Sequence, residues 1–92
     1  MRDKAFYIQS IKMDLYRIIT ATGDIQKEVA LESVQEFFHH ALNDFNKIEL
    51  SDNERVLRDS VNHLMHAIKQ NIQDPYKRLR WVEEVMTVRC RL

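Results

Sequence analysis

The sequence predicts an all-α protein, a four-helix bundle with up-down-up-down topology, and three observations predict it. Apolar residues recur at steps of three and four along most of the 92-residue chain, which is the period of an amphipathic helix. The chain holds one Gly and one Pro, too few turn residues for a sandwich or barrel of many short strands. Start signals for helices divide it into four segments, and short connections make neighbouring helices antiparallel. We therefore expect one helical domain over residues 1–92.

The first two helices are expected over residues of about 3–20 and 25–47. Between them, Gly23 is expected to take a positive φ and Asp24 to cap the second helix. The apolar row of the first helix consists of Ile8, Ile11, Leu15 and Ile18. That of the second consists of Leu31, Val34, Phe38, Ala41, Phe45 and Ile48.

The third and fourth helices are expected over residues of about 52–71 and 75–90. Ser51 followed three residues later by Glu54 is a capping box, and Asp74 before Pro75 pairs an N-cap with a proline at the first helical position. The third row consists of Leu57, Val61, Leu64 and Ile68, and the fourth of Trp81, Val85, Val88 and Leu92.

The first and fourth helices carry more apolar surface than one core requires. Phe6 and Met13 lie nearly opposite the Ile11 row, and Leu79, Val82 and Met86 form a second row on the fourth helix. This surplus predicts a second contact face, for another copy of the chain or for another protein. Aromatic residues and arginines dominate such interfaces. The predicted partner-binding residues are Phe6, Met13, Tyr16, Tyr76, Arg78, Arg80, Trp81, Val85, Arg89 and Arg91.

The charges cancel over the whole chain, with 14 basic and 14 acidic side chains, but they are unevenly distributed. Residues 75–92 hold five basic against two acidic side chains, while the second helix is acidic. With Tyr76 and Trp81 interleaved among its cations, the fourth helix offers an alternative function in nucleic-acid binding. The neutral total and the lack of a helix pair with a polar recognition helix disfavour this alternative.

The four histidines offer a second alternative, a metal site. Glu36 and His39 have the Glu-x-x-His spacing of di-iron bundles, and His39 and His63 are expected at one height, with Asp59 nearby. These side chains point away from the apolar rows, and the outward sides of two helices do not converge on one ion. We therefore expect solvated histidines and no metal.

Around His66, the sequence resembles histidine phosphotransfer domains, which are four-helix bundles with an exposed histidine. The resemblance covers His66 and Lys69 only, and Gln70 stands where that family has a small residue. Catalysis has little other support, since Cys90 has no orienting base in the sequence and no glycine-rich phosphate loop exists.

The expected function is that of a small, non-catalytic interaction or regulatory module, self-associating or bound to a protein partner. We expect no cofactor and no membrane partner. The N-terminus does not have the pattern of a secretory signal, and no apolar run approaches the roughly 18 residues that cross a bilayer. A single Cys forms no internal disulfide. These features predict a cytoplasmic location.

Overall fold

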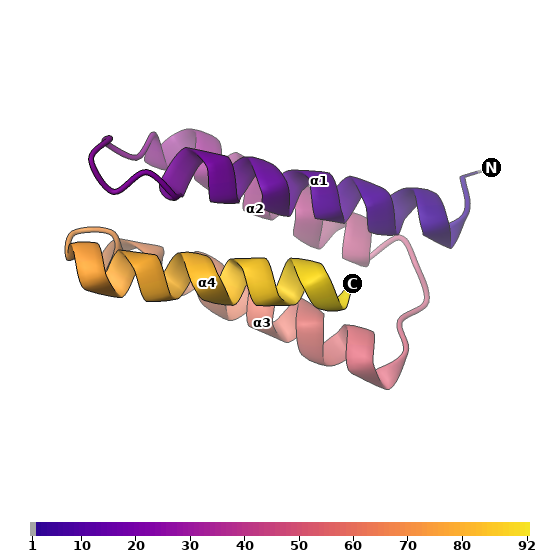
Figure 1. The fold of residues 1–92 in the computed structure, drawn as a ribbon. Helices are drawn as coiled ribbons and strands as arrows, with labels where there is room; N and C mark the ends of the chain where they lie inside the picture. The colour runs from indigo at the N-terminus through magenta and orange to yellow at the C-terminus, as the bar shows by residue number, and fades with distance from the viewer. Residues whose placement is uncertain (1) are drawn as a thin grey trace.

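The computed structural model describes residues 2–92 and has four helices packed as a bundle (Figure 1). They are α1 (Lys4–Thr22), α2 (Leu31–Phe45), α3 (Asp52–Asn71) and α4 (Pro75–Arg91). Successive helices run in opposite directions, so the α1–α2 and α3–α4 connections lie at one end and both termini at the other (Figure 1). Helix α1 contacts α2 and α4, and α3 contacts the same two helices. The predicted up-down-up-down bundle is confirmed, with extents of 41 × 22 × 19 Å.

The core consists of the predicted apolar rows. Its buried members are Ile11, Leu15, Ile18, Val34, Phe38, Ala41, Phe45, Leu57, Val61, Leu64, Ile68, Trp81, Val82, Val85 and Val88. The row ends Ile8, Leu31, Ile48 and Leu92 pack against this core and are partly buried. Steps of three and four therefore identified the buried side of all four helices.

Two of the predicted helix starts are confirmed in detail. The Ser51 hydroxyl accepts from the Glu54 backbone N–H at 3.2 Å, and the Glu54 carboxylate accepts from the Ser51 N–H at 2.8 Å. Asp74 accepts from the backbone N–H groups of Tyr76 and Lys77, with Pro75 opening α4. Side-chain oxygens thus satisfy donors that have no partner within the first helical turn.

The α1–α2 connection corrects three predictions. Helix α1 continues to Thr22, and α2 begins at Leu31 rather than near residue 25 and ends at Phe45. Gly23 has a φ of −73°, which is right-handed and not positive. Glycine is favoured there because a Cβ atom at this position would lie only 2.8 Å from the Ile19 carbonyl oxygen. Asp24 caps no helix; its carboxylate accepts from the Gln26 N–H in the loop, and Ala30 is the N-cap of α2.

The side chain of Arg78 explains why this connection stays non-helical. Its guanidinium donates to the carbonyl oxygens of Thr22 at 2.8 Å, Asp24 at 2.6 Å and Lys27 at 3.0 Å. Helix continuation would use these carbonyls internally, whereas a helix end leaves them free to accept. The planar fork of arginine can donate to several acceptors at once. Arg78 therefore ties the end of α1 and the loop to the start of α4.

Within residues 2–92, none of the four helices combines the length and the apolar character that a membrane span requires.

Candidate functional site

The outward sides of α1 and α4 hold most of the exposed apolar surface. Among the described residues, eight large apolar side chains are exposed, and six lie on these two adjacent helices. We call this set the α1–α4 face; its members are Phe6, Met13, Tyr16, Tyr76, Leu79 and Met86. The other two are Ile25, in the α1–α2 connection, and Val56, on α3. The predicted surplus on the first and fourth helices is thus present in the folded chain, except that Val82 of the predicted second row is buried in the core.

Each exposed aromatic ring on this face carries an arginine. The guanidinium carbon of Arg2 lies 4.5 Å from the ring centre of Phe6. The corresponding distances are 5.5 Å from Arg89 to Tyr16 and 5.9 Å from Arg80 to Tyr76. Such cation–π contacts contribute about 0.5–1 kcal/mol at exposed sites. These contacts hold the aromatic rings in place. Aromatic and arginine side chains often contribute most of the binding energy at protein interfaces.

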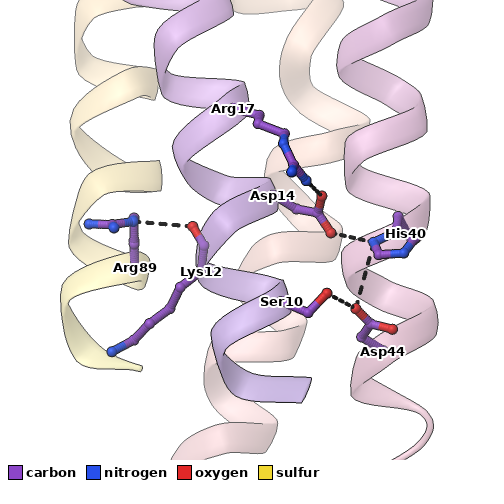
Figure 2. Close-up of polar contacts among 7 residues, drawn as sticks. All are labelled: Ser10, Lys12, Asp14, Arg17, His40, Asp44 and Arg89. Carbon is purple, nitrogen blue, oxygen red and sulfur yellow. Dashed lines mark hydrogen bonds and ion pairs between the residues drawn. The ribbon is translucent and has the colours of Figure 1, made fainter. Parts of the chain in front are cut away.

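Arg89 also joins the two helices of the face. Its Nε donates to the backbone carbonyl of Lys12 at 3.1 Å, as Figure 2 shows at the left of the view. The same guanidinium therefore bonds α1 and lies over Tyr16 of α1. Arg89 is half-buried by these contacts, and they fix the spacing of α1 against α4 at the centre of the face.

The charges of the four helices differ in sign. Helix α1 has three basic side chains against Asp14, and α4 has five against two acidic ones. Helix α2 has three acidic side chains and no Lys or Arg, while the three acidic and three basic side chains of α3 cancel. The α1–α4 face therefore lies on the two cationic helices of the bundle, and the acidic helix α2 packs beside α1.

Three predicted partner-binding residues are corrected, because the bundle buries them. Val85 is fully buried, and Trp81 is buried with its Nε1 donating to the Leu64 carbonyl at 3.0 Å. The Trp81 ring also meets that of Phe38 edge-to-face, with centroids 5.9 Å apart. Arg78 is held inside by the α1–α2 connection. The remaining members, Phe6, Met13, Tyr16, Tyr76, Arg80 and Arg91, are exposed, and Arg89 is half-buried.

The histidines weighed as metal ligands do not form a metal site with Glu36 and Asp59. His39 and His66 line one hollow of about 310 Å³ between α2 and α3, together with Gln35 and Lys69. His63 and Asp59 line a different groove of about 510 Å³ between α3 and α4. Within residues 2–92, neither hollow holds three potential ligand atoms close enough together to share an ion.

A different polar cluster joins α1 to α2 (Figure 2). Asp14 and Asp44 are buried, and the exposed ring of His40 lies between their carboxylates. His40 Nδ1 is 2.5 Å from Asp14 Oδ2 and 3.6 Å from Asp44 Oδ2. Arg17 donates to Asp14 Oδ1 at 3.0 Å, and the Ser10 hydroxyl donates to Asp44 Oδ2 at 2.7 Å. Among the described residues, no buried side-chain nitrogen or oxygen atom lacks a hydrogen-bond partner.

Sequence reasoning missed this cluster, although two signals for it were present. His40 and Asp44 stand four residues apart and so share one side of α2. Asp14 directly precedes Leu15 in the apolar row of α1, at the edge of the buried side. Only the packing of α1 on α2 brings Asp14 to His40, and no spacing along the chain encodes that contact.

The structure thus offers one broad apolar surface and one compact polar cluster. Cys90, the thiol considered in the sequence, is exposed. Comparison of the chain with protein-family models, with curated proteins and with solved structures gives no match.

Proposed function

We propose that this protein is a non-catalytic interaction module that binds another protein through the α1–α4 face. The observation that carries the proposal is the gathering of six of eight exposed large apolar side chains on two adjacent helices. Exposed apolar side chains gathered on neighbouring helices cost solubility, and such a concentration is typical of an interaction site. A chain of 92 residues also builds a small core, so a bound partner adds stability to the folded state.

Charge specifies the chemistry of the partner. Because α1 and α4 both carry net positive charge, a partner with acidic side chains around an apolar centre complements the face. The same face on a second copy would bring like charges together, which disfavours a two-fold dimer through this surface. We therefore assign as occupant an acidic, amphipathic surface of a different protein, such as a helix with one apolar side.

The state of the arginines favours a protein over a nucleic acid. Arg78 is buried, and Arg89 bonds the Lys12 carbonyl while lying over Tyr16. Binding to phosphates requires cations that are free to displace counterions along the backbone. On this face, arginines instead frame an apolar surface, which is the composition of a protein interface.

A photo-crosslinking amino acid introduced into the full-length protein tests the proposal. Placed at Met13 or Met86, it should give adducts in cells with a protein whose crosslinked segment is acidic and apolar. The matched control is the same amino acid at the exposed Glu36 of α2, where no such adduct is expected. A synthetic peptide of the crosslinked segment should then bind the purified protein, more weakly at higher salt and more weakly still to a Met86→Glu variant.

The other outcomes contradict the proposal in distinguishable ways. Adducts of the chain with itself, with a mass above 11.1 kDa by light scattering, would replace the acidic partner by a second copy. Adducts with nucleic acid would instead support nucleic-acid binding by the basic helix α4. Equal adducts at Met13, Met86 and Glu36, or none, would remove the α1–α4 face as a binding site.

A further inference from the structure

The Asp14–His40–Asp44 cluster has the donor atoms and the spacing of a metal site. One oxygen from each carboxylate and one imidazole nitrogen all lie within 4.8 Å of one another. In a zinc site, donors about 2.0–2.2 Å from the ion stand roughly 3–4 Å apart. The His40–Asp44 separation of 3.6 Å lies within that range, and the His40–Asp14 separation of 2.5 Å lies below it. Small side-chain rotations would therefore place an ion among the three donors.

We propose that Asp14, His40 and Asp44 bind one divalent transition-metal ion of the zinc class. Two carboxylates and one imidazole suit Zn²⁺ and its first-row neighbours, whereas Mg²⁺ and Ca²⁺ take oxygen ligands alone. His40 and Asp44 come from one side of α2, four residues apart, and Asp14 comes from α1. The ion would thus bridge the two helices that make the most extensive contacts in the bundle.

Charge supports an ion at this position. The side chains of Asp14 and Asp44 are only 2% and 4% exposed, and both carboxylates approach the same imidazole nitrogen. Buried charges in proteins are paired or coordinate metals. Arg17 and Lys47 pair with the Oδ1 atoms of these carboxylates, and a divalent cation would add a partner for the two Oδ2 atoms, which come from the adjacent helices α1 and α2.

The surrounding residues already orient these ligands. Arg17 holds Oδ1 of Asp14, and Lys47 Nζ lies 3.7 Å from Oδ1 of Asp44, so each Oδ2 is left facing His40. The Ser10 hydroxyl donates to Oδ2 of Asp44 and fixes that carboxylate further. Outer partners of this kind orient metal ligands and tune their affinity.

The site is open on one side. The His40 side chain is 56% exposed, so an ion can enter from solvent, and water can complete its coordination. Binding requires a lone pair on Nδ1, so any proton on that nitrogen leaves to solvent when the ion arrives. The other ring nitrogen, Nε2, takes no part in coordination. Three protein ligands with water in the remaining position form an accessible metal site rather than a closed structural one.

Zinc chloride titrated by calorimetry into the metal-stripped, untagged full-length protein tests the proposal. We expect one equivalent of Zn²⁺ per chain and a higher thermal midpoint in its presence, because the ion binds only the folded site. His40→Gln should lower the affinity by at least about tenfold, as loss of a metal ligand does. In nitrogen-detected spectra of the histidines, zinc should shift Nδ1 of His40 and leave the rings of His39, His63 and His66 unchanged.

Matched variants separate this site from other zinc-binding groups. His39→Gln and Cys90→Ser remove the neighbouring histidine and the exposed thiol, and each should keep the wild-type affinity. Because His40 is exposed, the His40→Gln variant should fold, and its helical circular dichroism should confirm this. Asp44→Asn is the second variant that removes a proposed ligand. Unchanged affinity in His40→Gln, loss of affinity in His39→Gln or Cys90→Ser, or less than one equivalent in the wild type would overturn the proposal.

Discussion

The α1–α4 pair and the α2–α3 pair build the same core but present different surfaces. Six of the eight exposed large apolar side chains lie on α1 and α4, whereas Val56 is the one on α2 and α3 among the described residues. Helices α2 and α3 separate apolar from polar side chains, as one buried side requires. Helices α1 and α4 add apolar residues beyond that requirement. Since folding needs only one apolar side per helix, the surplus supports the proposal that this surface binds a partner.

The two pairs also differ in how they use charge. Arg80 and Arg89 of α4 lie over aromatic rings, and Arg89 also bonds a backbone carbonyl of α1 and so joins the two helices. At the contact between α1 and α2, the carboxylates of two buried aspartates approach one histidine ring, so several ionisable groups lie close together. We therefore propose a macromolecular partner for the α1–α4 face and an ion for the cluster at the α1–α2 contact.

The largest expected effect on the free energy of unfolding distinguishes the buried side of α4 from its exposed side. Trp81→Ala should lower the free energy of unfolding by about 4 kcal/mol, because it removes a buried ring that packs on Phe38. Leu79→Ala, two residues away and exposed, should change it by less than about 0.5 kcal/mol. Urea unfolding followed by circular dichroism measures both. Similar losses in the two variants would show that the outer side of α4 is part of the core.

The next effect compares two arginines of the same helix. Arg78→Met should destabilise the fold by about 3 kcal/mol, because three backbone carbonyls lose a charged donor. Hydrogen exchange should increase in the α1–α2 connection. Arg80→Met serves as the control, since Arg80 is exposed and lies over Tyr76. A loss in Arg78→Met no larger than that of the control would contradict the role of Arg78 in fixing the connection.

The smallest effect concerns an ion pair that joins the two pairs of helices. Lys4 Nζ of α1 lies 2.6 Å from Glu54 Oε1 of α3. The hydrogen bond from the Lys4 ammonium, aided by the Ser51 backbone N–H, lowers the pKa of Glu54 below its ordinary value of 4.5. A carboxyl whose pKa is lower in the folded state stabilises the fold above the unfolded pKa, and this contribution is lost as pH falls through the folded value.

Stability should therefore decrease as pH falls below about 4.5, and Lys4→Met should reduce this slope. Its cost near neutral pH should be about 0.5 kcal/mol, as is typical of exposed ion pairs. Urea midpoints between pH 3 and pH 6 measure the slope, with Lys12→Met as the control on the same helix. An identical pH dependence in the wild type and Lys4→Met would show that the pair does not link α1 to α3.

Local patterns predicted most of the fold and, as partner-binding residues, four of the six members of the α1–α4 face. The rows at steps of three and four identified the buried residues, and Phe6 and Met13 were placed outside because they lie opposite the Ile11 row. The second helix was predicted to start six residues too early. The guanidinium of Arg78 donates to three carbonyl oxygens of the α1–α2 connection, and nothing in the local sequence reveals these hydrogen bonds. Tryptophan is typical both of interfaces and of cores, so the residue type alone did not show that Trp81 is buried.

By itself, the sequence determined the four helices, the caps at Ser51 and Asp74, and the apolar surplus of the first and last helices. Periodicity and capping act within a few residues along the chain, so they can be read without a fold. Tertiary structure alone decided that Arg78 is buried and that His40 lies between Asp14 and Asp44. The Asp14–His40 and Thr22–Arg78 contacts join residues 26 and 56 positions apart, and only the register of the packed helices decides that these residues meet.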